Sequence, residues 1–80
     1  MQLDLSTLFT ATGTAKLADL PAYEARAREL SPPGADVTLT GNAPVWLYLR
    51  VAHALHGHVK KLFYDSPVTG AVEIFNHDPR

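Results

Sequence analysis

The sequence contains no cysteine, which excludes disulfides, thiolate metal sites and cysteine nucleophiles and fits a reducing cytoplasm. We also expect no signal peptide, because residues 1–4 are not a basic region followed by an apolar run. The most apolar stretch, residues 43–55, is too short to cross a membrane and contains Arg50 and His53. We therefore expect a soluble, cytoplasmic protein without a membrane partner.

A strong charge of one sign is absent as well. The formal net charge is −1, which argues against a protein that coats long nucleic acids, such as a DNA duplex, through charge alone. Residues 1–40 carry three basic and five acidic side chains, whereas residues 41–80 carry four basic and three acidic ones and all four histidines. Any chemistry on an anion is therefore expected in the second half of the chain.

The chain is short. Eighty residues make a single domain, which we take as residues 1–80. A domain of this size buries only about 60–65% of the surface of its unfolded chain and is marginally stable alone. This favours a homodimer or a larger assembly.

The first half of the sequence predicts a strand, a helix and a second strand. Leu3 and Leu5 alternate with polar residues and indicate a short strand, whereas residues 7–16 leave strand and turn open. A helix follows from apolar residues spaced three, four and three apart: Leu20, Tyr23, Ala27 and Leu30. Its N-cap is expected at Asp19 or Leu20, with Pro21 in the first turn, an i,i+4 pair of Glu24 with Arg28, and an end at residues 31–34. Residues 36–40 predict a β-branched strand.

The second half predicts one more helix and a hairpin. The helix opens at residues 41–44, continues to His56 or Gly57, and is apolar around most of its circumference, so we expect it to be largely buried against a sheet. Residues 59–64 and 71–75 are expected as strands joined by a turn over 65–70. The predicted fold class is α/β, a small single-domain Rossmann-like or ferredoxin-like sandwich in the order β-α-β-α-β-β.

A glycine turn leads from the strand at 36–40 into the second helix. Unpaired N–H groups and the helix dipole make a helix start attractive to anions, and Gly41 permits a close approach by a phosphate. This geometry is typical of a phosphate or nucleotide cradle. Because Pro44 removes one donor, an ordinary connecting loop is the alternative, and Trp46 either stacks on a base or belongs to the core.

Three of the four histidines lie within residues 53–58. His53 and His56 are three apart and are expected on one helix face, while Asp65 and His77 follow the next two predicted strands. Histidine and aspartate together suit a divalent ion such as Mn²⁺, or a general acid and base for phosphodiester cleavage. The alternative is a partly buried, hydrogen-bonded His53 with the other histidines exposed. Neither an H-E-x-x-H zinc motif nor a G-x-S-x-G serine turn is present.

Several of these segments together resemble a known family. They are Gly41-Asn42-Ala43-Pro44-Val45-Trp46-Leu47, Ala52-His53, His56, Tyr64-Asp65, Gly70-Ala71-Val72 and Asn76-His77. Over about residues 36–77 the chain resembles the small CRISPR-associated ring nucleases of type III systems. The relevant branch is the manganese-dependent Csx/Crn one, whose members have a minimal CRISPR-associated Rossmann fold.

The resemblance implies an enzyme that cleaves the second messenger cyclic tetra-adenylate to linear di-adenylate products and so switches off type III CRISPR signalling. It implies homodimers, with the ligand sandwiched between two dimers. The binding region would comprise Gly41, Asn42, Ala43, Pro44 and Trp46; the catalytic or Mn²⁺-associated positions would be His56, Asp65 and His77, with His53 as a further candidate.

The chain departs from the family pattern at two motifs, and we expect it to lack the extra strand that the family commonly adds after the last histidine. The Pro-Arg that typically follows Tyr-Asp is replaced by Ser66-Pro67-Val68, and a basic residue of the glycine turn is replaced by Asn42. The candidates to supply the missing charge are Arg50, Lys60, Lys61 and Arg80. The alternatives to a ring nuclease are a non-catalytic module that sequesters or senses the same nucleotide, and a general RNA-binding or metal-binding protein.

Overall fold

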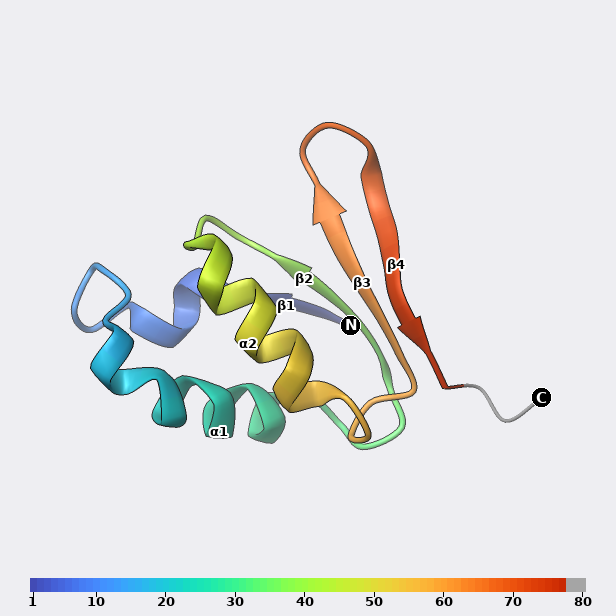
Figure 1. The fold of residues 1–80 in the computed structure, drawn as a ribbon, viewed down its shortest axis with the longest axis horizontal. Coiled ribbons are helices and arrows are strands. Elements are labelled where there is room, and N and C mark those ends of the chain that lie inside the picture. The colour runs from blue at the N-terminus through green and yellow to red at the C-terminus, as the bar shows by residue number, and fades with distance from the viewer. Residues whose placement is uncertain (78–80) are drawn as a thin grey trace.

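The computed structural model describes residues 1–77, which form one mixed sheet and two α-helices (Figure 1). The elements in chain order are β1 (Gln2–Asp4), α1 (Leu20–Leu30), β2 (Asp36–Thr40), α2 (Val45–Leu55), β3 (Lys61–Ser66) and β4 (Gly70–Asn76), with short 3₁₀ helices at Leu5–Phe9 and Leu17–Asp19. The strand order is β1-β2-β3-β4; β1, β2 and β3 are parallel, and β4 is antiparallel to β3. The predicted α/β class and the order β-α-β-α-β-β are confirmed.

Both helices cover the same face of the sheet (Figure 1). β1, β2 and β3 lie next to one another in chain order, so the two connections between them cross the sheet in the same direction. Because such connections are right-handed, α1 and α2 lie on the same face. Val37 and Leu39 of β2 and Leu62 of β3 point into the core below the helices, whereas Thr38 and Thr40 alternate onto the other face. The core is completed by Leu3, Leu5, Leu20, Tyr23, Ala27, Leu47, Val51, Leu55 and Val59.

The second helix is less buried than the sequence predicts. Val45 and Leu49 are 73% and 66% exposed, because within residues 1–77 no third α-helix lies beside α2 on that side of the sheet. The expected Glu24–Arg28 pair is also wrong: Glu24 accepts from Arg50 of α2 at 3.1 Å, which ties the two helices together. Asp19 is the N-cap of α1 and Pro21 lies in its first turn, as predicted.

The first strand of the hairpin lies two residues later than expected, whereas the second covers the expected residues 71–75 and one more at each end. Val59 is buried but has only an isolated bridge to His56, and β3 begins at Lys61 because Asp36 of β2 pairs with that residue. Asp65 therefore belongs to β3 and pairs with Ala71, instead of lying in the turn. Within residues 1–77, no helix is long and apolar enough to span a membrane.

Candidate functional site

The glycine turn lies at the carboxyl end of β2, directly beside the end of β1. Gly41 has a φ of +101°, and a Cβ built there would overlap the Asp4 carboxylate and lie 3.1 Å from the Leu5 nitrogen. That carboxylate is itself fixed, since Asp4 Oδ1 accepts from the Ser6 N–H at 2.9 Å and from the Ser6 hydroxyl at 2.7 Å. Only glycine fits this position, for reasons of both backbone conformation and space.

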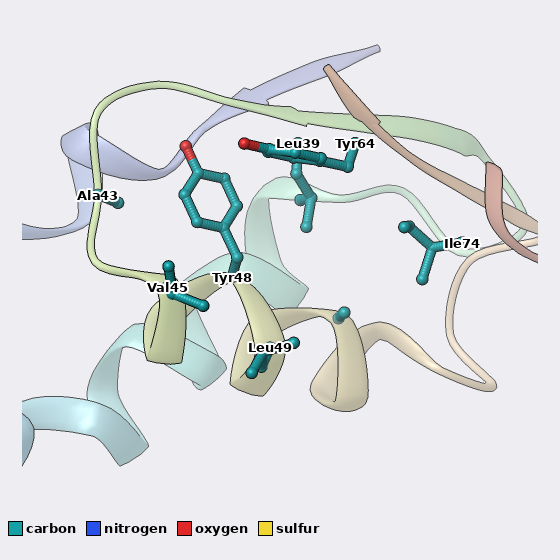
Figure 2. Close-up of a pocket in the computed structure, with 8 residues that line it drawn as sticks. Leu39, Ala43, Val45, Tyr48, Leu49, Tyr64 and Ile74 are labelled. Carbon is teal, nitrogen blue, oxygen red and sulfur yellow. The ribbon is translucent and has the colours of Figure 1, made fainter. Parts of the chain in front are cut away.

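Tyr48 holds the same turn from the helix side. Its hydroxyl donates to the Gly41 carbonyl oxygen, and the Tyr64 ring lies edge-on with a centroid distance of 5.1 Å. Figure 2 shows the two rings between α2 and the sheet. Burial raises the pKa of Tyr48, and the neighbouring Tyr64 and Asp4 raise it further, so the hydroxyl keeps its proton and remains a donor.

The turn continues into an open helix start. Pro44 is the N-cap of α2, with no capping side chain and no acidic residue in the first turn. The N–H groups of Val45 and Trp46 have no acceptor inside the helix and carry its partial positive charge. Trp46 is half-buried and packs against the core, which agrees with the core alternative for this residue. Asn42 is exposed and Ala43 half-buried beside it.

An apolar cavity of about 340 Å³ adjoins the turn, between α2 and the β3–β4 hairpin (Figure 2). Its lining residues are Leu39, Ala43, Val45, Tyr48, Leu49, Ala52, Tyr64 and Ile74. We call it the α2–β4 groove. Ala43 belongs both to the turn and to the groove, so the two features are continuous.

Two histidines meet at the other end of α2. His56 Nε2 and His77 Nε2 are 2.8 Å apart, and the Phe75 ring lies 5.1 Å from each imidazole. His56 is the C-cap of α2, with an extended backbone, so it leaves the helix and turns toward the end of β4. The ring of His56 thus meets that of His77, a partner that the spacing of His53 and His56 does not indicate. His53 is exposed, which excludes the alternative of a partly buried His53.

His58 has a structural role that the sequence did not reveal. Its Nε2 lies 2.7 Å from the Ser31 carbonyl oxygen and 3.1 Å from that of Arg28, at the carboxyl end of α1. The ring thereby contacts the C-cap carbonyl of Ser31 and adds a second partner to the Arg28 carbonyl, which already accepts from the Ser31 N–H. His58 is half-buried, which contradicts the alternative in which the histidines other than His53 are exposed.

Asp65 lies away from the histidine pair. The His77 N–H donates to the Lys60 carbonyl oxygen at 2.8 Å, and Asp65 follows Lys60 by five residues. At a rise of about 3.3 Å per residue this places Asp65 about 16 Å along the strand, near the carboxyl edge. Among residues 1–77, no group of three or more His, Asp or Glu side chains is placed to hold a metal ion. One chain does not assemble His56, Asp65 and His77 into a single site.

The basic residues expected to supply the missing positive charge also lie in different parts of the molecule. Arg50 is engaged with Glu24 and faces α1 instead of the turn. Lys60 and Lys61 lie where β3 begins, level with the end of β4 and therefore close to His77 along the backbone. Arg80 lies outside the described residues. The positive charge available to an anion is thus nearer the histidine pair than the glycine turn.

Replacing Tyr48 with phenylalanine tests the contact with the turn. We expect the free energy of unfolding to fall by about 1 kcal/mol at pH 7, because one hydrogen bond is lost. The folded pKa of Tyr48 is raised above the unfolded value of 10.0, so this contribution is present below pH 10 and decreases as the pH rises further. Urea unfolding of both chains at pH 7 and above pH 10 measures this; a constant difference would contradict it.

These features define a small α/β protein with a glycine turn at the carboxyl edge of parallel strands and an imidazole pair at the opposite edge. The family model described as CRISPR-associated protein (Cas_csx3) matches residues 15–80. The chain therefore belongs to this family of CRISPR-associated proteins. No curated protein and no solved structure matches the chain significantly.

Proposed function

We propose that the protein is a ring nuclease that binds cyclic tetra-adenylate and cleaves it to linear di-adenylate products, ending type III CRISPR signalling. The observation that carries the proposal is the contact of His56 Nε2 with His77 Nε2 at 2.8 Å. Two exposed imidazoles at this distance provide a proton acceptor and a proton donor side by side. Membership in the CRISPR-associated family supports the same assignment.

The chemistry needs a base and an acid. In the proposed reaction one imidazole takes the proton from a ribose 2′-hydroxyl, whose oxygen attacks the adjacent phosphorus. The bond from phosphorus to the 5′-oxygen breaks, and the second imidazole donates a proton to that oxygen. The products are a 2′,3′-cyclic phosphate end and a 5′-hydroxyl end, and two such cuts open the ring into di-adenylates. The Nε2 atoms of His56 and His77 contact each other in the structure. The ligand must therefore separate the two rings before either nitrogen can reach it.

The two ends of the molecule have different tasks in this proposal. The Gly41 turn precedes α2 and His56 follows it, so about 16 Å of helix separates them. One chain cannot present both to the same phosphate. The geometry favours a nucleotide held by the Gly41 edge of one copy and reached by the histidine pair of another, which fits a ligand sandwiched between two dimers. Asp65 would then act from the Gly41 edge.

Manganese does not fit residues 1–77 of a single chain. His56 and His77 supply two nitrogens in mutual contact, without the oxygen ligands that Mn²⁺ prefers. We derive no step through the metal. A requirement for Mn²⁺ would mean that ligands such as Asp65 come from a second copy.

The test is incubation of the purified chain with cyclic tetra-adenylate, with Mn²⁺ or with a chelator, followed by chromatographic separation of the products. We expect linear di-adenylates, and linear tetra-adenylate RNA serves as the competing substrate. An intact ring after long exposure to stoichiometric protein would contradict the enzyme; if the ring were bound but intact, the sequestering module would be the better description. Preference for linear RNA would favour the general RNA-binding alternative.

A further inference from the structure

The segment between α2 and β3 carries one histidine of the proposed pair and holds the backbone of the other. We call residues 56–60 the α2–β3 loop. His56 is the first residue of this loop and forms an isolated bridge with Val59, which is 3% exposed. His77 follows β4, but its N–H donates to the carbonyl oxygen of Lys60 at 2.8 Å. The contact between the two Nε2 atoms therefore depends on where the loop lies.

His58 joins this loop to the first helix. Its Nε2 lies 2.7 Å from the Ser31 carbonyl oxygen and 3.1 Å from the Arg28 carbonyl oxygen. Both partners are acceptors, so Nε2 carries the proton and donates. Ser31 is the C-cap of α1 and is 1% exposed, so the ring meets the helix at a buried residue. Because a hydrogen bond is stronger where water is excluded, the ring is a strong link between α1 and the loop.

Gly57 separates the two histidines of the loop and directs their rings toward different elements. Its φ is +84°, a conformation that residues with a Cβ rarely adopt. The backbone turns sharply there, so that His56 meets His77 beyond the end of β4, whereas His58 reaches the carboxyl end of α1. The loop is thus held on two sides by side chains that are two positions apart.

The backbone of the loop also contacts the connection between α1 and β2, which lies beside it (Figure 1). The Gly34 N–H donates to the His58 carbonyl oxygen at 2.9 Å, and the Lys60 N–H donates to the Ala35 carbonyl oxygen at 2.9 Å. These backbone contacts do not depend on the side chain at position 58. A substitution there therefore removes the ring contact and leaves the backbone contacts in place.

We propose that His58 is a positioning residue for the cleavage of the nucleotide, an inference that rests on the proposed function. By binding the carboxyl end of α1, its ring holds the α2–β3 loop so that His56 and His77 stay aligned for proton transfer. Its Nε2 is engaged with α1, so His58 acts through the loop and not on the substrate. Alignment matters because a displacement of reacting groups by about 1 Å lowers a rate by about 10²-fold.

The experiment compares single-turnover cleavage of cyclic tetra-adenylate by the native chain, His58→Ala and His58→Gln. We expect the rate to fall about 10- to 100-fold in His58→Ala. The affinity for the nucleotide should stay within about twofold of native, because the Gly41 turn lies at the other end of α2. His58→Gln should recover most of the rate, since its amide N–H can donate to the same carbonyl oxygens. Circular dichroism establishes that each variant is folded.

Tyr23→Phe is the matched control, because it removes one hydrogen bond from the opposite end of α1. The Lys16 N–H donates to the Tyr23 hydroxyl at 3.0 Å, and Tyr23 lies in the first turn of the helix. This variant should lose similar stability but cleave at the native rate. An equal loss of rate in Tyr23→Phe, or a His58→Gln chain as slow as His58→Ala, would mean that His58 only stabilises the fold and would overturn the proposal.

A second measurement needs no nucleotide. Amide hydrogen exchange reports on the His77 N–H, which donates to the Lys60 carbonyl oxygen. This exchange should be about fivefold faster in His58→Ala than in Tyr23→Phe, the effect of one hydrogen bond lost locally. Equal exchange in the two variants would overturn the proposal. If the native chain left cyclic tetra-adenylate intact, the nuclease would be contradicted, and the exchange rates would still decide whether His58 holds the loop.

Discussion

A Gly41→Ala chain is expected to have a free energy of unfolding about 2–4 kcal/mol lower than the native chain, a large fraction of the stability of a small domain. The backbone at φ +101° is strained for any residue with a Cβ, and the new methyl group would overlap the Asp4 carboxylate. Urea unfolding followed by the fluorescence of Trp46, the only tryptophan, measures the change. Under the proposed function, affinity for cyclic tetra-adenylate should fall with it.

Gly34→Ala is the matched control for this prediction. Gly34 also has a positive φ, +75°, but a Cβ there would meet nothing within 4 Å, so only the backbone strain of about 1–2 kcal/mol applies. The excess loss in Gly41→Ala should be partly recovered when Asp4→Ala is added, because the overlapping oxygen is gone. Equal losses for the two glycines, or no coupling to Asp4, would mean that the carboxylate does not confine the turn.

Hydrophobic periodicity was sufficient to predict both helices and the order of the elements along the chain. It failed at the start of β3, because buried Val59 has the apolar character of a strand residue although it fills the core from a loop. The register is set instead by pairing with β2, where Asp36 meets Lys61. Such a partner lies 25 positions away and leaves no local signal in the sequence. Because β3 starts and ends two residues later than predicted, Asp65 lies in this strand instead of in the predicted turn.

The site was predictable only where its residues are close in sequence. The glycine turn and the helix that follows it form one local pattern, and the structure places them as expected. Asp4 contacts that turn because β1 pairs in parallel with β2. Tyr48 contacts it because α2 is oriented with the Tyr48 side chain toward the Gly41 carbonyl oxygen. In the same way, the sequence spacing pairs His56 with His53, whereas the side chain that His56 contacts is His77, 21 residues later.

The exposed side of α2 shows a different limit. When apolar residues occupy most of the circumference of a helix, the pattern predicts that the helix is buried. The pattern does not say which sides of the helix the fold covers. Val45 and Leu49 satisfy the pattern and remain exposed within one copy. The apolar pattern therefore predicted the helix but not which of its sides the fold covers.

His56→Ala is expected to lower the rate of ring cleavage by about 10²–10⁴-fold, the usual contribution of a general acid or base. Binding of cyclic tetra-adenylate should change little, because the proposed binding turn lies at the other end of α2. Single-turnover cleavage measures the chemical step, and fluorescence anisotropy with labelled nucleotide measures the affinity. His56 and His77 are exposed, so the fold should tolerate the substitution.

His53→Ala is the matched control, since His53 is exposed and contacts His56 through its backbone carbonyl, which the substitution keeps, while the imidazole contact joins His56 and His77. It should cleave at the native rate. His77→Ala should lose about as much activity as His56→Ala, and the double variant should lose little more, because groups that act as a unit are not additive. Independent, multiplying losses would mean that the two imidazoles do not share one reaction. A His56→Ala chain that cleaves normally would remove the histidine pair from the mechanism and leave the glycine turn as the only part of the site still supported.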